Sequence, residues 1–441
     1  MNWKLPQDVL YIINTLNQKG YKAYAVGGCV RDMFLKKTPQ DWDITTSAPP
    51  EAIIDSFPKT IPTGIKHGTV TVLCGKTPYE VTTFRVDGAY EDHRKPETVT
   101  FTEDIREDLS RRDFTMNAMA YHPETGLRDP FGGREDIERK LIRCVGDPLV
   151  RFDEDALRML RAVRFSAQTG FSIDEDILAA MKTLAPLLSA ISGERVRDEL
   201  VKTLLSDRPA KVRVLHETGL LAVILPELDR CFYTHQNHPY HILNVGDHSL
   251  RVLENTPKSL SLRLAALLHD IGKPDMKTTD EAGIDHFKGH GSVSTKLAEE
   301  IIARLRLDNK TKDAVLLLVR EHDRQFAVTK KSIRRAASIV GKDMFFDLLS
   351  LQVADALGQN PTMVTERLAR LEAAKALYNE ILADEDALSV SDLAIGGRDL
   401  LELGYCGKEI GAALSKALEL VLDDPSANQK EILLKKIQNT D

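Results

Sequence analysis

Two aspartates separated by a single tryptophan, Asp41 and Asp43, are the residues near the start of the chain that are best suited to chemistry. They fall in a segment that reads as a β-strand, where alternate side chains project from one face and their Cα atoms lie ~6.5 Å apart. Carboxylates at that spacing can share Mg²⁺ ions, which neutralise triphosphate charge and activate an attacking hydroxyl. Because Asp-x-Asp is also common in solvated turns, the pair indicates phosphoryl or nucleotidyl transfer only in a suitable setting.

A double glycine upstream, Gly27-Gly28, supplies such a setting, because it precedes a helical segment that carries Arg31 and Asp32. A glycine turn that feeds a helix N-terminus presents free N–H groups and the positive end of the helix dipole to phosphate. A double glycine alone is equally a tight turn. In the order strand, turn, helix and second strand, residues 24–47 favour the catalytic head of a nucleotidyltransferase.

A second group of chemically competent residues lies in the second half of the chain, at the ends of apolar segments that read as helices. Neutral imidazole and carboxylate together suit first-row divalent metals. A lone histidine on a helix is usually packed or solvated, but this repetition predicts a metal site whose candidate ligands are His248, His269, Asp270, His290, His322 and Asp355. Lys273 could contact phosphate or simply place a charge at a helix end. No metal role is assigned to His235, His238, His241 or His286.

The elements expected to position the aspartates are a helix over 6–18, a strand over 21–26 and a helix that starts at the prolines 49–50. Three β-like runs follow, at residues 59–64, 68–75 and 78–85, and the last carries Glu80 and Arg85. Glu80 would be a third catalytic carboxylate if its strand neighbours that of Asp41 and Asp43. Otherwise it is an exposed strand glutamate.

Residues 86–110 are polar and charged without a sustained period, and we expect them to form a loop. The segment that follows combines guanidinium groups able to pair with phosphate, Arg111 and Arg112, with polar groups able to hold a ribose hydroxyl, Asp113 and Asn117. A charged helix start capped by Asp113 explains the same residues.

The sequence EDALRMLRAVRF, residues 154–165, reads as one helix that places Asp155 and Arg158 on one face. Cytosine and adenine present an amino donor beside a ring-nitrogen acceptor, so a carboxylate next to an arginine would accept C and A and reject G and U. Arg161 and Arg164 on adjacent faces are further candidates for binding the nucleotide. An ordinary surface salt bridge is the alternative.

The composition is that of a globular protein, with 42% hydrophobic and 28% charged residues in 441. Five separated cysteines without a C-x-x-C pair support neither a disulfide framework nor a thiolate zinc site, and a reducing cytoplasm fits best. The chain shows no signal pattern and no run long enough for a membrane span. The net charge of −7 argues against coating DNA but leaves a structured RNA partner open.

The succession GGCVRD, DWD, EVTTFR, RRDFTMNAMA, DPFGG and EDALRMLRAVRF resembles the bacterial tRNA nucleotidyltransferase and poly(A) polymerase family, the class II branch of the polymerase-β-like superfamily. The resemblance spans residues 20–205 and implies an α/β head with a small mixed sheet, followed by an all-α neck and body. It implies that Asp41 and Asp43 hold Mg²⁺. The other implied sites are Gly27, Gly28 and Arg31 at the triphosphate, Asp113, Asn117 and Arg112 at the ribose, Glu154, Asp155 and Arg158 at the base, and Glu194 and Arg197 on a supporting helix.

HDIGKP, at residues 269–274, and the order of the histidines and aspartates around it resemble the HD phosphohydrolase superfamily. The resemblance implies an all-α domain in which His248, His269, Asp270 and Asp355 bind a divalent transition metal. His290 and His322 would complete a two-metal site acting on a phosphoester or cyclic phosphate. An HD scaffold retained only for docking RNA is the alternative.

We therefore expect four parts: a head over 1–145, a helical neck and body over 146–225, an HD domain over 226–360 and a helical tail over 361–441. In the tail, a glycine-rich turn before Lys408 could meet the RNA backbone, or the helices could simply close the HD domain.

The expected function is addition of CCA to tRNA 3′ ends from CTP and ATP, with an HD activity on terminal 3′-phosphate or cyclic phosphate. An A-adding enzyme of a split pathway and a poly(A) polymerase are close alternatives. Residues 86–110 resemble the flexible loop of full CCA-adding members. An HD phosphohydrolase with an RNA-binding head is the alternative from another class.

Overall fold

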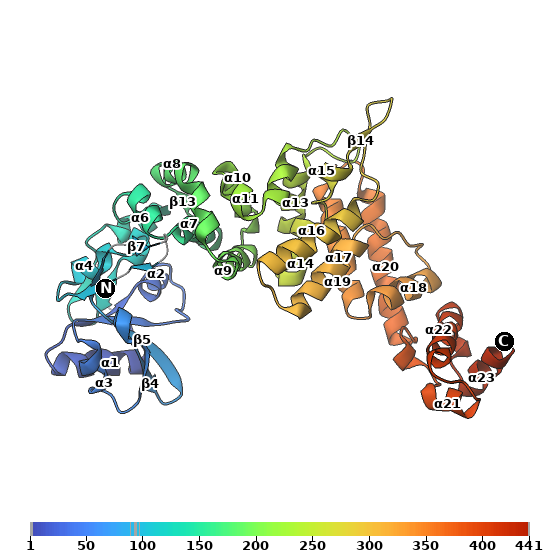
Figure 1. Cartoon of the computed structure of the whole chain (residues 1–441), viewed down its shortest axis with the longest axis horizontal. Helices are drawn as coiled ribbons and strands as arrows, with labels where there is room; N and C mark the ends of the chain where they lie inside the picture. Colours follow the sequence, from blue (N-terminus) through green and yellow to red (C-terminus); the bar gives the residue numbers. More distant parts are fainter. Residues whose placement is uncertain (1–2, 89, 92–94, 97, 440–441) are drawn as a thin grey trace. The chain divides into compact units, whose positions relative to one another are not determined.

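The computed structural model describes residues 3–88, 90–91, 95–96 and 98–439, and the chain divides into two compact units, Met1–Ile224 and Leu225–Asp441. The first unit contains a mixed sheet and helices, and the second is almost entirely helical (Figure 1). This confirms the predicted fold class. The finer division of each unit into two parts stays a prediction.

The first unit is built on a seven-stranded sheet with the order β11-β10-β1-β2-β5-β4-β3. Its central pair, β2 and β5, is parallel, and the other neighbours are antiparallel. The expected strand at 21–26 and the three β-like runs all form strands of this sheet. The strands are β1 (Ala23–Val26), β2 (Asp43–Thr46), β3 (Thr60–Gly64), β4 (Thr69–Cys74), β5 (Thr77–Thr83), β10 (Ala120–His122) and β11 (Gly126–Arg128).

Helices pack on the sheet by faces that the sequence pattern predicts. The helix α1 (Gln7–Gln18) buries Val9, Ile12, Ile13 and Leu16, the spacing of one apolar helical stripe. The prolines at 49–50 start α3 (Pro50–Ile54), where the missing N–H of proline costs nothing. The remaining helices of the head are α2 (Gly28–Phe34), α4 (Ile105–Ser110) and α5 (Gly133–Glu138).

The prediction of an irregular loop over 86–110 is wrong for much of that segment. β6 (Arg85–Asp87) pairs with β9 (Val99–Phe101), β7 (Tyr90–Glu91) pairs with β8 (Lys95–Pro96), and α4 follows. Residues 89, 92–94 and 97 of the predicted loop lie outside the described residues. Strands of two or three residues are too short to show a period, so periodicity could not reveal them.

The predicted single helix over 154–165 is also wrong, because the chain breaks at Asp155. α6 (Pro148–Glu154) ends there, Asp155 is extended with φ −142° and ψ 102°, and α7 (Leu157–Thr169) begins two residues later. The Asp155 carboxylate accepts a hydrogen bond from the Leu157 backbone N–H at 3.1 Å. A short acidic side chain competes in this way with the helical hydrogen bonds of the backbone.

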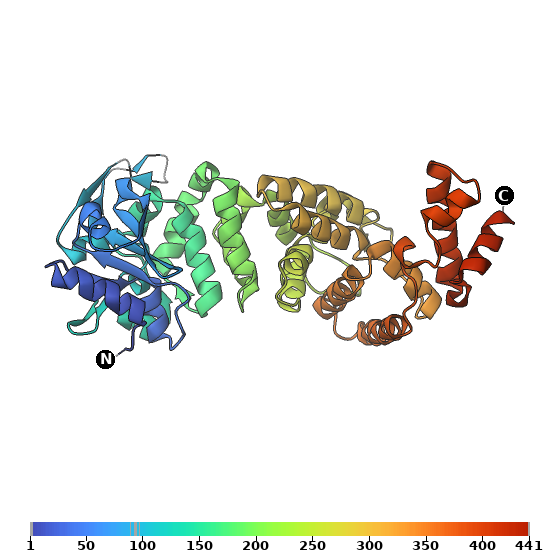
Figure 2. The same cartoon turned by 90° about the horizontal axis from the view of Figure 1, so that it is seen from below.

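Apart from one short parallel pair of strands, β12 (Leu141–Ile142) and β13 (Ser172–Ile173), the rest of the first unit is helical (Figure 2). These helices are α8 (Glu175–Leu184), α9 (Gly193–Leu204), α10 (Val212–Glu217) and α11 (Leu220–Ile224). α7 packs against α9, and the arginines of α7 are thereby brought to the carboxylates of α9.

The second unit is a helical assembly in which the five segments predicted to carry metal ligands all lie on or directly after helices. α13 packs against α14 and α19, and α17 packs against α14, α16 and α19. The helices are α12 (Pro226–Asp229), α13 (Val245–Glu254), α14 (Leu260–Leu268), α15 (Lys273–Met276), α16 (His290–Arg304), α17 (Asn309–Glu321), α18 (Lys330–Val340), α19 (Met344–Gly358) and α20 (Thr365–Ala383). One short hairpin joins β14 (Thr278–Thr279) to β15 (Asp285–His286).

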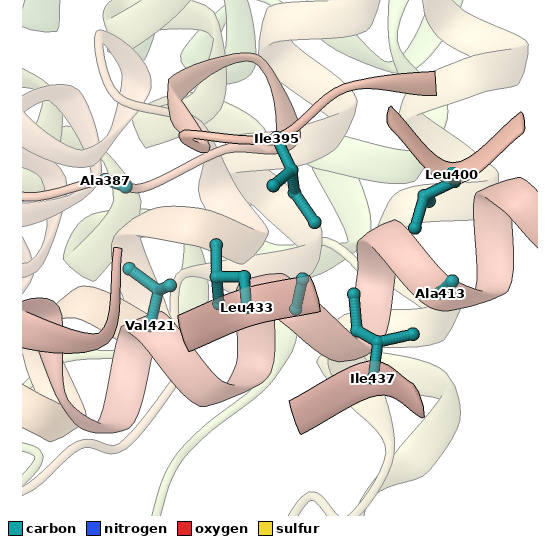
Figure 3. Close-up of a cluster of buried hydrophobic side chains, with 8 residues drawn as sticks. Ala387, Ile395, Leu400, Ala413, Val421, Leu433 and Ile437 are labelled. Atoms are coloured by element: carbon teal, nitrogen blue, oxygen red, sulfur yellow. The ribbon is translucent and has the colours of Figure 1, made fainter. Parts of the chain in front are cut away.

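The last helices, α21 (Gly397–Glu402), α22 (Lys408–Asp423) and α23 (Lys430–Gln438), enclose a small apolar cluster of their own (Figure 3). The turn before α22 contains Gly404 and Gly407 with φ of +91° and +52°, a conformation that favours glycine. The cluster comprises Ala387, Ile395, Leu400, Ala413, Ala417, Val421, Leu433 and Ile437. The predicted helical tail is therefore present, and its contact with RNA stays a prediction.

All five cysteines are free thiols, as the sequence predicts. Within the described residues, no helix combines the length and apolar character that crossing a bilayer requires.

Candidate functional site

The three head carboxylates lie on or just before two neighbouring parallel strands. β2 begins at Asp43, and Asp41 lies just before the strand rather than on it, which corrects the expectation that both are strand residues. β5 is the parallel neighbour of β2, with Ile44 opposite Val81. Glu80, one residue before Val81, is therefore level with Asp43, and the strand-neighbour condition for a third carboxylate is met.

The charges around Asp43 show how close these groups are. Desolvation by the surrounding protein raises the pKa of Asp43, Arg112 opposes the shift, and the negative charges of Glu80 and Asp41 add to it. Like charges held together disfavour ionisation unless a cation compensates them. The carboxylate set therefore fits a divalent cation such as Mg²⁺, which Asp41, Asp43 and Glu80 would hold.

The glycine turn lies against Arg112. Gly27 has φ of +77° and immediately precedes α2. A Cβ atom at Gly27 would lie 2.8 Å from Arg112 Nη1, so the absence of a side chain allows the guanidinium to approach the turn. The same guanidinium lies 3.7 Å from Asp108.

Asp113 is the centre of a polar network. Its Oδ1 accepts hydrogen bonds from the Phe114 N–H (2.8 Å) and Asn117 Nδ2 (3.1 Å), and its Oδ2 accepts from Arg161 Nε (2.8 Å). Arg31 Nη1 donates to Asn117 Oδ1 at 2.8 Å. Burial opposes ionisation, but Arg161 and the donated hydrogen bonds outweigh it and lower the pKa of Asp113 to about 2. The predicted residues Arg31, Asn117, Asp113 and Arg161 are thus brought together.

Phe165 gathers three of the arginines, a role that the sequence did not reveal. The guanidinium carbons of Arg164, Arg31 and Arg161 lie 4.1, 5.1 and 5.4 Å from its ring centroid. Arg164 Nε is also 2.8 Å from Glu199 Oε2 on α9. Aromatic faces attract cations, so the ring of Phe165 in α7 holds together three guanidinium groups, which are also paired with the carboxylates of Asp32, Asp113 and Glu199.

The alternative interpretation, a salt bridge between Asp155 and Arg158, is wrong, and their role in base selection stays a prediction. Arg158 Nη1 bonds to Glu154 Oε2 and to the Arg151 carbonyl (2.9 Å), and its Nη2 bonds to the Arg111 carbonyl (3.1 Å). Asp155 is held instead by Arg195 of α9, at 3.0 Å. Because the chain breaks at Asp155, the two side chains leave different elements and find different partners.

In the second unit, all six predicted ligands converge. Asp270 is the shared member: its Oδ2 lies 3.3 Å from His269 Nε2 and 3.6 Å from His248 Nε2, and its Oδ1 lies 3.2 Å from His290 Nε2 and 3.7 Å from His322 Nε2. Two groups of potential ligand atoms result, His248–His269–Asp270 and Asp270–His290–His322, each within 4.8 Å. Asp355 Oδ1 closes the first group at 2.9 Å from His248 Nε2.

Hydrogen bonds from Nδ1 to backbone carbonyls orient three of the histidine rings. The Nδ1 atoms of His269, His290 and His322 lie 2.9, 2.9 and 2.7 Å from the carbonyl three residues earlier, so each Nδ1–H donates and each Nε2 faces the centre. Such bonds set the tautomer of metal-binding histidines. Among the described residues, His269 Nε2 is buried without a hydrogen bond of good geometry. The site therefore fits divalent metal ions.

The Lys273 ammonium group is engaged by two side chains of the second unit. Its Nζ lies 2.6 Å from Asp270 Oδ2 and 2.9 Å from Gln236 Oε1, and the side chain is buried. Burial alone would raise the pKa of Asp270, but His269 and Lys273 hold it well below its ordinary value. Lys273 thus contacts the candidate metal ligand Asp270 and lines the cavity at the site, and its contact with a phosphate stays a prediction.

The four histidines without an assigned metal role are not all remote from the site. His238, His241 and His286 line the 350 Å³ cavity above the ligands. Burial, with the charges of Lys273 and His248, lowers the pKa of His241 to about 3, so His241 is neutral at physiological pH. Only their position in the fold reveals this proximity.

Three domain families match the chain. "Poly A polymerase head domain" covers residues 23–143, "Probable RNA and SrmB- binding site of polymerase A" covers residues 170–232, and "HD domain" covers residues 240–389. The fold and the two sites thus define a nucleotidyltransferase head combined with an HD domain.

Similar proteins narrow this class. The CCA-adding enzyme of Lactobacillus helveticus is 34% identical over 99% of both chains. That of Geobacillus thermodenitrificans is 54% identical, over 50% of this chain and 55% of the relative, so this alignment spans about half of its length. The crystal structure of the Bacillus stearothermophilus CCA-adding enzyme in complex with CTP covers 99% of both chains at 32% identity, with a TM-score of 0.74.

The chain belongs to the CCA-adding enzyme family of nucleotidyltransferases.

Proposed function

We propose that the chain adds C, C and A to the 3′ end of tRNA from CTP and ATP, without a nucleic-acid template. The observation that carries the proposal is the placement of Asp41, Asp43 and Glu80 at two adjacent parallel strands, with the positive charge of Arg112 acting on Asp43. Negative ligands and positive side chains placed together suit a metal-bound triphosphate. The similarity to a CTP-bound CCA-adding enzyme supports this substrate class.

In this mechanism the RNA 3′-hydroxyl attacks the α-phosphorus of the nucleotide, loses its proton, and the bond to pyrophosphate breaks. Mg²⁺ bound at the carboxylates would neutralise triphosphate charge. Arg31, Arg161 and Arg164 bind the phosphates, since Phe165 keeps their positive charges together. Asp113 and Asn117 orient two of these arginines and stand near the ribose.

Base choice rests on Asp155 and Arg158. Asp155, held by Arg195, accepts from the exocyclic amino group of C or A, and Arg158, oriented by Glu154, donates to the ring nitrogen. G and U present the opposite polarity, so they leave buried groups unpaired.

The test offers Mg²⁺ and three tRNAs, ending at the discriminator base, at C or at CC, with CTP, ATP or both. Growth to CCA that stops there is the expected result. Addition of A only to the CC-ended tRNA would indicate a split pathway, and a long A tail would indicate a poly(A) polymerase. An absence of growth with any substrate would contradict the proposal.

We further propose that the second unit is a metal-dependent phosphohydrolase that removes a 3′-phosphate or opens a 2′,3′-cyclic phosphate. The supporting observation is the pair of ligand groups sharing Asp270, because paired sites suit hydrolytic displacement at phosphorus. Water adds to phosphorus, one P–O(ribose) bond breaks, and the released oxygen takes a proton. Hydrolysis of p-nitrophenyl phosphate and of a cyclic nucleotide, with Mn²⁺, Co²⁺, Ni²⁺ or Mg²⁺, is the test. Inactivity on both with every metal would refute it.

A further inference from the structure

A second cavity of 420 Å³ adjoins the ligand cavity in the second unit. Its walls come from the segment before α13, the connection between α17 and α18, the end of α19 and the first turns of α20. It shares four lining residues with the ligand cavity, His238, His241, Asp323 and Gln359. The two cavities are therefore parts of one depression.

Arg367 connects this second cavity directly to the ligands. Its Nη2 lies 2.7 Å from Asp355 Oδ2, and the other oxygen of Asp355 lies 2.9 Å from His248 Nε2. One end of the cavity thus opens at the candidate metal cluster. A molecule lying in the cavity would have one end where a phosphate could reach the metals.

The cavity carries more positive than negative side chains. Arg324, Arg367 and Arg370 line it, against the carboxylates Asp323 and Glu366. Arg324 and Arg367 are engaged by Glu321 and Asp355. Within the described part of the chain, Arg370 contacts a single polar group, the Phe326 carbonyl, at 3.4 Å. Arg370 therefore retains donors for an anionic group farther from the metals.

The remaining lining is apolar and partly aromatic. Tyr240 stacks on His238 with centroids 5.5 Å apart and planes at 22°, and Phe326 packs on Phe345 at 5.8 Å. Val328, Met363 and Leu371 complete the apolar wall. Unpaired bases stack on aromatic rings and on guanidinium planes, so this combination fits a nucleobase better than it fits a small inorganic ester.

We propose that this second cavity binds the nucleoside that carries the phosphate presented to the HD site, with the base on the apolar wall and a further phosphate or sugar oxygen at Arg370. The inference rests on the proposed phosphohydrolase function and specifies its substrate class: a nucleotide, either free or at an RNA 3′ end. Arg367 holds the Asp355 carboxylate in place beside His248, at the end of the cavity where the phosphate would lie.

A binding measurement on chelator-treated protein tests the proposal without any activity. Adenosine 3′-monophosphate and a short single-stranded oligonucleotide ending in 3′-phosphate are titrated calorimetrically into wild type, Arg370→Ala and Lys375→Ala. Lys375 is an exposed cation on α20 that does not line the cavity, so it is the matched control. We expect about tenfold weaker binding for Arg370→Ala, since a charge-assisted hydrogen bond is lost, and no change for Lys375→Ala.

Each outcome decides a point. Wild-type binding of neither probe, or equal binding by wild type and Arg370→Ala, would overturn the proposal. Tighter binding of the oligonucleotide assigns the subsite to an RNA end, and binding of the mononucleotide alone assigns it to free nucleotides. The head is the same in all three proteins, so a difference between the two variants belongs to this cavity.

Kinetics separate this inference from the function on which it rests. In the loaded enzyme, Arg370→Ala should raise KM about tenfold for adenosine 3′-monophosphate and leave hydrolysis of p-nitrophenyl phosphate unchanged. A failure to hydrolyse either compound would refute the phosphohydrolase function, while the calorimetric comparison would still decide whether the subsite exists. Equal loss on both compounds would show that Arg370 acts on the metal cluster and would refute the subsite.

Discussion

In the second unit, four histidines and Asp355 gather around the buried Asp270, whereas at the head Asp41 and Glu80 stay exposed and Asp43 lies close to Arg112. Among the described residues, groups of three potential ligand atoms within 4.8 Å occur in the second unit alone. His269 and Lys273 offset the negative charge of Asp270, whereas at the head Arg112 alone among the named neighbours of Asp43 opposes the like charges of Glu80 and Asp41. The candidate ligand atoms of the second unit are thus gathered within a few ångströms, whereas the head carboxylates are spread over the start of β2 and the neighbouring β5.

The substitution with the largest expected effect is Asp41→Ala, which should affect the head site and leave the site of the second unit unchanged. Losing a carboxylate from the head should reduce nucleotide incorporation on the order of 10³-fold or more, because the metal contributes several kcal/mol at the transition state. The metal content of the HD site, measured by mass spectrometry, should not change. Asp55→Ala removes an exposed aspartate from the end of α3 and should be active. Incorporation by Asp41→Ala at the wild-type rate would refute the catalytic assignment.

The second test asks whether Asp270 joins two metal positions. Asp270→Asn should lose both metal ions after dialysis, while His290→Ala should lose one, since only the latter leaves the His248–His269–Asp270 group intact. Incorporation by the head should be retained in both variants. Asp280→Asn, which changes an exposed partner of His286, is the control. Full metal content in Asp270→Asn would show that the ligands do not form a shared site.

Asp113→Asn tests the head network by a smaller effect. The change keeps an acceptor for the Phe114 N–H but weakens the hold on Arg161, so KM for CTP and ATP should rise about 10–100-fold, as expected for a charged hydrogen bond. Asp176→Asn, an exposed aspartate in the first turn of α8, is the control. An unchanged KM would mean that Arg161 needs no such support.

The Asp113 carboxylate should also affect the stability of the fold in acid. The pKa of Asp113 is depressed to about 2 in the folded state, so its ionisation stabilises the fold above the ordinary aspartate pKa and this stabilisation is lost as pH falls toward 2. At neutral pH, Asp113→Asn should therefore have a lower free energy of unfolding than wild type, and this difference should become smaller in strong acid. Denaturant titrations at neutral and acid pH measure it, and a gap that widens in acid would contradict the assignment.

The smallest expected effect concerns the acid limb of Mg²⁺ binding at the head, that is, the pH range in which Mg²⁺ affinity falls as the carboxylates become protonated. Asp43 must be ionised to bind the cation, and its raised pKa makes affinity fall at a higher pH than for an ordinary aspartate. Glu80→Gln removes a like charge and should move this limb to lower pH, whereas Arg112→Gln should move it to higher pH. The Mg²⁺ dependence of incorporation, normalised at neutral pH, measures both shifts. If Mg²⁺ affinity falls at the same pH in Glu80→Gln as in wild type, Glu80 does not act on the metal-binding carboxylates Asp41 and Asp43.

Local pattern predicted the element types well. The β-like runs at 59–64, 68–75 and 78–85 became β3, β4 and β5, and the apolar helical segments became α13, α14, α16, α17 and α19. Periods of two and of 3.6 residues report which face of an element is buried, and this information is carried by neighbours in sequence. The six candidate ligands were predicted from the residues that these segments carry and from the resemblance of their order to the HD superfamily, and their binding of metal stays a prediction.

Side-chain partners were not predictable in this way. Arg195 as the anchor of Asp155, Phe165 beneath three arginines and Lys273 on Asp270 all depend on which elements approach each other. The break at Asp155 shows the limit even within one segment, because one carboxylate bonding to the backbone overrode a favourable helical pattern.

By itself, then, the sequence determined the kinds of elements, the family and the identities of the candidate ligands. The tertiary structure decided that Glu80 lies level with Asp43, that Asp270 is shared, and that a second cavity opens beside it. The physical reason is one of range: the propensity and periodicity that form an element act over a few residues, whereas the charges and hydrogen bonds of a site join residues far apart in the chain.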